Sequence, residues 1–108
     1  MSTKKEYVDF VMEVIDGVGV IRSKKMFGEY MIYIDEKPAL LVCDDTVYVK
    51  MVDELFQDFI MCDQGFPYEG ARKHYILDID DQEQTRYLIQ LLLPYLKIPK
   101  RRQKKFID

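Results

Sequence analysis

The sequence predicts an α+β fold in which one antiparallel sheet carries its helices on one face. Three observations lead there: amphipathic helical patterns open and close the chain, short apolar segments lie between them, and tight-turn signals separate those segments. The expected order is α-β-β-β-β-α-β-α. A chain of 108 residues with 48% hydrophobic and 32% charged residues has the size and composition of one globular domain.

The first helix is expected over residues 3–16. Thr3 and Glu6 have capping-box spacing, and apolar side chains follow at helical intervals on one face: Tyr7, Phe10, Val11, Val14 and Ile15.

Four strands are expected next, over residues 20–25, 29–34, 39–43 and 46–50. Asp35-Glu36-Lys37-Pro38 and Asp44-Asp45 are turn signals between them. The continuous apolar run of residues 39–43 suits a central strand.

The period then returns to 3.6, and predicts a second helix over residues 52–62. Gly65, Pro67 and Gly70 place residues 64–71 in a loop, and residues 73–79 form a fifth strand with Tyr75 and Leu77 on one side. The last helix begins at Asp80-x-x-Glu83, and Pro94 should kink or end it near Leu93. Its expected buried stripe is Leu88, Leu91, Leu92, Tyr95 and Leu96.

Charge divides the chain into a domain over residues 1–97 and a basic tail over residues 98–108. Residues 1–96 have a balance of −8, whereas residues 97–108 have a balance of +5. The tail has the composition of an arm that contacts nucleic-acid phosphates; the alternatives are a solvated terminus, or one that folds back onto the acidic body. Its candidate contact residues are Lys100, Arg101, Arg102, Lys104 and Lys105.

No catalytic, metal or cofactor site is expected. Cys43 and Cys62 form no CxxC pair, and no basic residue beside either would lower its pKa, so both read first as small buried hydrophobes. A cysteine nucleophile paired with His74, the single histidine, is the remaining catalytic alternative. The acidic pairs fall at turns or at a helix start, where turn chemistry explains them.

The N-terminus lacks the apolar core of a signal peptide, and no window reaches the length of a membrane span. A cytoplasmic protein without membrane contact is therefore expected. Because the strands are unusually apolar, the sheet face away from the helices also needs a cover, and a homodimer is the natural one.

One segment resembles a known family. Lys25-Met26-Phe27-Gly28-Glu29-Tyr30-Met31-Ile32-Tyr33 is similar to the Met-Phe-Gly-x-Tyr-x-x-Tyr signature of TfoX/Sxy N-terminal domains. Matching pieces follow in the family's order: residues 39–42, 45–50, 66–68 and 74–75. Together with the opening helix they cover roughly residues 3–97. Met31 departs from the family's usual small residue, and the second, helical domain of longer members does not follow.

The resemblance implies a two-layer, secretion-chaperone-like fold, with a strongly bent antiparallel sheet, helices on one side, and commonly a dimer. It also implies a non-enzymatic regulatory domain that works through protein partners, linked to transcription of competence genes. The alternatives are a nucleic-acid-associated accessory protein that uses the tail, and a small ligand-binding domain or enzyme.

The motif residues are Met26, Phe27, Gly28, Tyr30 and Tyr33. We expect Met26 and Phe27 to fill the core and Gly28 to supply a positive φ or a bulge. A partner-binding loop is the functional alternative.

Overall fold

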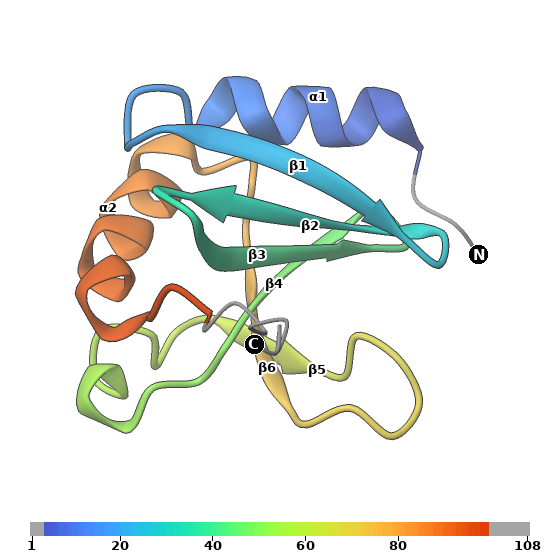
Figure 1. Cartoon of the computed structure of the whole chain (residues 1–108). Coiled ribbons are helices and arrows are strands. Elements are labelled where there is room, and N and C mark those ends of the chain that lie inside the picture. Colours follow the sequence, from blue (N-terminus) through green and yellow to red (C-terminus); the bar gives the residue numbers. More distant parts are fainter. Residues whose placement is uncertain (1–3, 100–108) are drawn as a thin grey trace, which may run out of the picture.

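The computed structural model describes residues 4–99, in which six antiparallel strands form one sheet of order β1-β2-β3-β4-β6-β5. Figure 1 shows the α-helices lying alongside this sheet. The helices are α1 (Lys5–Val14) and α2 (Gln82–Leu92). The strands are β1 (Ile21–Met26), β2 (Glu29–Ile34), β3 (Lys37–Cys43), β4 (Thr46–Val49), β5 (Asp63–Gly65) and β6 (His74–Leu77). The predicted α+β class and order are confirmed, with local differences given below.

Tight two-residue turns connect the first four strands. Both residues of each turn have a positive φ, as in the hairpin turns whose twist matches that of the strands. The φ values are 49° and 84° at Phe27 and Gly28, 52° and 68° at Asp35 and Glu36, and 50° and 55° at Asp44 and Asp45. The turn signals at residues 35–36 and 44–45 were therefore predicted correctly, and β3 begins earlier than expected, at Lys37.

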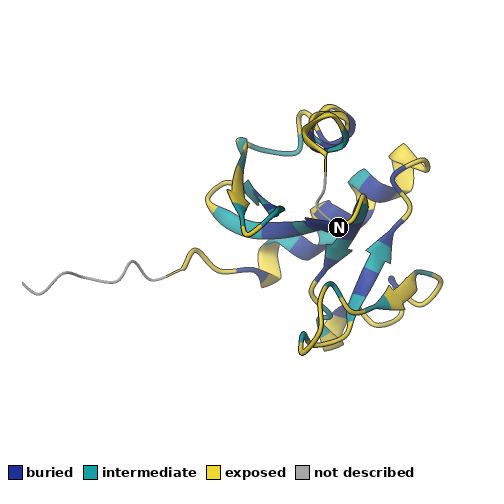
Figure 2. Cartoon of the chain, turned by 90° about the vertical axis from the view of Figure 1, so that its right-hand side faces the viewer, coloured by how far each residue is buried: buried dark blue, intermediate teal, exposed yellow. Residues whose placement is uncertain are grey.

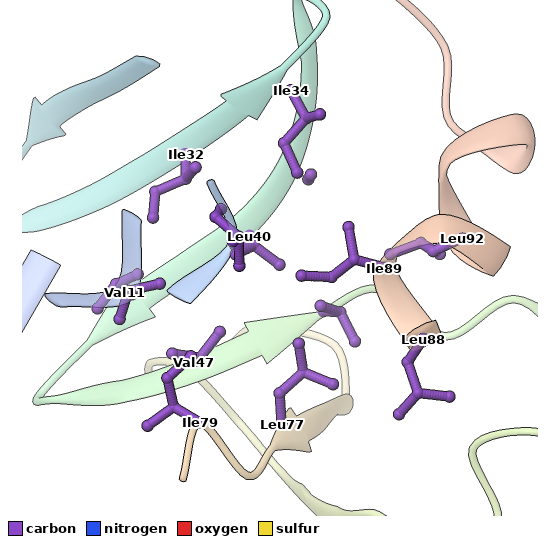
Figure 3. Close-up of a cluster of buried hydrophobic side chains, with 14 of the residues drawn as sticks. Val11, Ile32, Ile34, Leu40, Val47, Leu77, Ile79, Leu88, Ile89 and Leu92 are labelled. Carbon is purple, nitrogen blue, oxygen red and sulfur yellow. The ribbon is translucent and has the colours of Figure 1, made fainter. Parts of the chain in front are cut away.

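The core lies between one face of the sheet and both helices. Alternate residues of β2 are fully buried while those between them are half-buried, so β2 has one fully covered face. That face continues through Leu40, Val42, Val47 and Leu77, which lie in register across the sheet. Figure 3 shows Leu40, Val47 and Leu77 in one cluster with Val11 of α1 and the apolar stripe of α2, Leu88, Ile89 and Leu92.

The sheet is strongly bent. In Figure 1, β1, β2 and β3 run together, whereas β4 and β6 cross beneath them in a different direction. A register shift between Ile32 and Tyr33 marks a bulge in the β2–β3 pair, and bulges increase local twist. The bend lets both halves of the sheet face the same core (Figure 2).

The prediction of a second α-helix over residues 52–62 was wrong. Residues 52–62 form a 3-10 turn, η1 (Asp53–Leu55), followed by irregular turns. Only Leu55 and Phe59 of the predicted apolar face are buried, while Phe56 and Ile60 are about half exposed. A helix of this length needs its whole apolar stripe packed against other elements, and here the exposure of Phe56 and Ile60 leaves that stripe incomplete.

The loop predicted over residues 64–71 begins with a strand that the sequence did not reveal. β5 (Asp63–Gly65) pairs with β6, with Gly65 opposite His74. Three residues containing no β-branched or aromatic side chain give no periodic signal, and the pairing depends on β6 alone.

Helix α2 begins one residue later than predicted. Its N-cap is Asp81, whose carboxylate accepts a hydrogen bond from the Gln84 amide at 3.2 Å, and not Asp80. Pro94 ends the helix as expected, since the last turn is the 3-10 segment η2 (Leu93–Tyr95). This tighter turn rotates Tyr95 out of the predicted stripe, and its side chain is 44% exposed.

At the other end of the described chain, the N-cap of α1 is Lys4, which makes no side-chain capping bond. Thr3 of the predicted capping box lies outside the described residues, as does the basic segment from residue 100 onward. No helix within residues 4–99 has both the length and the apolar character that a membrane span requires.

Candidate functional site

The face of the sheet opposite the helices is half-buried and mostly apolar. It carries the side chains that alternate with the core positions on β2, β3, β4 and β6. We call this surface the open face and define it by five residues of intermediate exposure: Met31, Tyr33, Leu41, Tyr48 and Ile76. Gly65 of β5 borders this face and leaves room for Ile76, because a Cβ at Gly65 would come within 3.1 Å of the Ile76 side chain.

The tip of the β1–β2 hairpin projects a large aromatic side chain into solvent. Phe27 is fully exposed, with a relative exposure of 102%, and it has a φ of 49°. The expectation that Phe27 plugs the core was therefore wrong, because both residues of a two-residue hairpin turn lie beyond the last strand pair. A positive φ is unusual for a bulky residue. An exposed, conformationally strained aromatic side chain fits the alternative of a partner-binding loop.

The other motif residues divide between the core and the open face. Gly28 has the predicted positive φ, at 84°, while Met26 is half-buried rather than a core plug. Tyr30 is buried in the core, with 7% exposure. Tyr33 lies on the open face, where the Arg22 guanidinium stacks 4.1 Å from its ring centroid and pairs with Glu36 at 2.9 Å. The motif thus builds one hairpin with an apolar tip.

The two cysteines have the surroundings of protonated thiols. Cys43 is buried, and desolvation together with nearby Glu29 raises the pKa of its thiol to about 12. Burial also raises the pKa of the Cys62 thiol, with Asp63 as the second cause. A thiolate nucleophile is disfavoured at both positions, since the thiolate is the reactive form.

His74 is half-buried and opens β6, within the strand that was predicted over residues 73–79. Its Nδ1 lies 2.7 Å from the Arg72 carbonyl oxygen, so this nitrogen donates the hydrogen bond, and its ring meets Tyr48 edge-on with centroids 6.3 Å apart. These contacts do not join the histidine to either cysteine. Within residues 4–99 no group of three or more His, Cys, Asp or Glu side chains could hold a metal ion.

The acidic residues at the turns and at the start of α2 have structural roles. Asp35 accepts a hydrogen bond from the Val20 amide at 2.9 Å and donates its own amide to the Val20 carbonyl at 2.8 Å, which ties the β2–β3 turn to the start of β1. Asp44 and Asp45 form the β3–β4 turn, and Asp81 caps α2.

A basic pocket of about 540 Å³ lies where β4 ends and the chain enters β6. Its lining includes Lys50, Arg72, Lys73 and His74, together with Met51 and Tyr68. Sequence reasoning missed this site because its cations come from separate segments. The run Arg72-Lys73-His74 within an otherwise acidic body was the available signal. The candidate nucleic-acid contacts Lys100, Arg101, Arg102, Lys104 and Lys105 lie outside the described residues, and their role stays a prediction.

Comparison with known proteins settles the family. The TfoX N-terminal domain profile matches residues 13–105, which is most of the chain. This chain belongs to the TfoX N-terminal domain family. A protein of Spirochaeta aurantia described as an uncharacterized 12.7 kDa protein in the trpE 5′ region is 32% identical to this TfoX-family domain over 107 residues. The alignment covers 97% of this chain and 93% of that protein.

Proposed function

We propose that this TfoX-family domain is a non-enzymatic regulatory module that acts by binding a protein partner. The observation that carries the proposal is Phe27, fully exposed at the tip of the β1–β2 hairpin. Aromatic side chains dominate the energetics of protein interfaces. An aromatic side chain that is exposed to solvent and packs on nothing in its own domain therefore favours a role in contacting a partner.

The chemistry of the described residues supports binding rather than turnover. Burial and nearby carboxylates favour the protonated thiol at both cysteines, and the ring of His74 contacts Arg72 and Tyr48. A nucleophile activated by a general base needs both groups within hydrogen-bonding reach, and no such contact links these side chains.

Membership of the TfoX N-terminal domain family supports a regulatory role. Resemblance to competence regulators favours a partner in the transcription machinery, reached through the hairpin tip. Affinity capture of the full chain from a cell extract tests this, with Phe27→Ala as the test variant and Tyr87→Ala as the matched control. Tyr87 is an exposed aromatic residue on α2, far in sequence from the hairpin, with 55% exposure.

Co-purification of a transcription component with the wild type and with Tyr87→Ala, but not with Phe27→Ala, is the expected result. Equal recovery with all three proteins would remove Phe27 from the interface. Turnover of a substrate by the purified chain would contradict the non-enzymatic role.

We propose further that the open face covers the same face of a second copy. The alternative, edge-to-edge pairing of sheets, is disfavoured at β1 because Arg22, Lys24 and Lys25 are exposed there, and a second copy would bring the same charges. The β5 edge is only three residues long. Face-to-face packing instead buries Met31, Leu41 and Ile76, for which burial of apolar area is favourable.

Sedimentation equilibrium at tens of micromolar protein tests the dimer. The wild type is expected to dimerise, and Met31→Glu to shift the equilibrium to monomer, while Gln90→Glu, at an exposed position of α2 on the opposite side of the sheet, leaves a dimer. A wild-type monomer at this concentration would overturn the dimer and leave the Phe27 interface untouched.

A further inference from the structure

We infer that the basic pocket beside β6 binds the phosphate group of a small phosphorylated ligand. This pocket is separate from the hairpin tip and goes beyond the proposed partner binding. Its volume, about 540 Å³, falls within the range of roughly 300–1,000 Å³ that is typical of small-molecule sites.

The charge of the pocket is opposite to that of the protein. The chain carries a formal net charge of −3, yet Lys50, Arg72 and Lys73 line this cavity and no carboxylate does. The ion pairs of the described residues, Lys5 with Asp9 and Arg22 with Glu36, are both elsewhere. Three cations around one concave surface give a local positive field, which attracts and orients an anion.

The backbone brings these cations together from two segments. Val49 pairs with Tyr75, so the next pair along the same antiparallel register places Lys50 across from His74. The hydrogen bond from His74 Nδ1 to the Arg72 carbonyl, 2.7 Å long, ties the loop to the start of β6. Lys50, directly after β4, therefore lines the same pocket as Arg72 and Lys73, which come directly before His74.

The side-chain types favour phosphate over other anions. Arg72 supplies a planar guanidinium that can donate two parallel hydrogen bonds to phosphate oxygens, and Lys50 and Lys73 supply compact ammonium charges. The Nε2 atom of His74 is the ring nitrogen not engaged by the Arg72 carbonyl.

Apolar lining beside the cations indicates that the ligand carries a flat apolar group as well. Met51, Ala71 and Tyr68 line the same pocket, and Tyr68 is 51% exposed. An aromatic ring and a thioether offer surfaces for stacking and for sulfur–aromatic contact. A phosphate on one side and a planar ring on the other describe a nucleotide, either free or as a unit of single-stranded nucleic acid.

The experiment is a titration of isotopically labelled full-length protein followed by amide chemical shifts. The probes are inorganic phosphate, AMP, adenosine and an oligothymidylate of eight nucleotides. AMP is expected to shift amides of residues 50–51 and 68–74, and adenosine to bind at least about tenfold more weakly, because it lacks the phosphate.

Matched variants test the cations. Arg72→Gln and Lys73→Gln should each weaken AMP binding about tenfold, whereas Lys24→Gln, an exposed lysine on β1, should leave it unchanged. Binding should also weaken as salt rises, because exposed charges are screened. Spectra of the free variants that match the wild type away from the substitution show that the fold is retained.

The outcomes distinguish the two possible sources of the phosphate from failure of the inference. Tighter binding of the oligothymidylate than of AMP at the same amides identifies nucleic acid as the source of the phosphate, and the reverse identifies a free nucleotide. Equal binding of adenosine and AMP, shifts outside the pocket, or no loss in Arg72→Gln and Lys73→Gln would overturn the inference. None of these results bears on capture of a partner through Phe27.

Discussion

Arg86 of α2 donates a hydrogen bond from its guanidinium to the carbonyl oxygen of Val14, at 3.0 Å, and another to the carbonyl of Asp16. Val14 is the last residue of α1, and the final turn of α1 has no basic side chain of its own. The cation that satisfies the end of one helix therefore comes from the other helix. This contact joins the two helices beside the core, where a positive charge is also favourable to the helix dipole.

We predict that Arg86→Ala lowers the free energy of unfolding by about 2 kcal/mol, because it removes two hydrogen bonds from a charged donor, of which the one to the Val14 carbonyl is partly buried. Urea unfolding followed by circular dichroism measures the change. Gln90→Ala, at an exposed position of the same helix, serves as the control and should change stability by less than about 0.5 kcal/mol. Similar values for both variants would show that the interhelical contact contributes little.

The cap of α2 gives a second prediction, with neighbouring residues as test and control. Asp81→Ala should destabilise the protein by about 1 kcal/mol, because Asp81 accepts the Gln84 amide hydrogen bond at the helix start. Asp80→Ala should have a smaller effect, since its side chain makes no such bond among the described hydrogen bonds. Thermal unfolding compares the two, and a larger loss at Asp80 would contradict the assigned cap.

The features that were predicted correctly are those that depend on short stretches of sequence. The turns at Asp35-Glu36 and Asp44-Asp45 and the end of α2 at Pro94 depend on φ preferences that a few residues determine, and these were predicted. The segment of residues 52–62 has a helical period, but whether it forms a helix depends on how much of its stripe reaches the core. Leu55 and Phe59 are buried and Val52 packs against the core, whereas Phe56 and Ile60 are about half exposed, so that outcome could not be predicted from the period.

The candidate functional residues also depend on contacts between distant segments, which the sequence alone did not predict. The positive φ at Gly28 was predicted correctly. The exposure of Phe27 was not, because it depends on β1 and β2 pairing as far as Met26 and Glu29, which leaves only two residues for the turn. The basic pocket depends on the pairing of β4 with β6, which brings together residues more than 20 positions apart. Long-range register is not encoded in any one segment.

Phe27 gives a prediction in which stability and binding change in opposite directions. Phe27→Asn should leave the protein as stable as the wild type or more stable by up to about 1 kcal/mol, because asparagine tolerates a positive φ and no core contact is lost. The same variant should lose the captured partner. Urea unfolding and affinity capture are the two measurements. A clear loss of stability would show that the ring packs on the protein after all.

Cys43 gives a prediction about pH. With a thiol pKa of about 12, against an ordinary value of 9.0, the thiolate fraction at pH 8 is about a thousandfold below that of an unperturbed cysteine. Alkylation of Cys62→Ser by iodoacetamide, which leaves Cys43 as the single thiol, should therefore be far slower than in urea-unfolded protein. Rapid alkylation under native conditions would show that Cys43 is neither buried nor protonated.

The same pKa has a consequence for stability. The folded state raises the pKa of Cys43 above its unfolded value, so its contribution to stability is fully present below about pH 9 and is lost as pH rises toward 12. Urea unfolding between pH 8 and pH 10.5 should show the loss for the wild type and a smaller one for Cys43→Ala. Tyr7 and Tyr48, whose pKa values are also raised by burial, contribute to the loss that both proteins share.

The basic tail can be tested separately from the pocket by truncation after Lys97. If the six basic residues of positions 97–108 neutralise six phosphates, binding to labelled duplex DNA should weaken roughly a thousandfold between about 50 and 200 mM salt. The truncated protein keeps Lys50, Arg72 and Lys73, so a loss of DNA binding on truncation assigns the contact to the tail. Unchanged binding would assign it to the folded domain. Absence of binding by either protein at 50 mM salt would contradict the alternative of a nucleic-acid arm, because phosphate contacts are strongest at low salt.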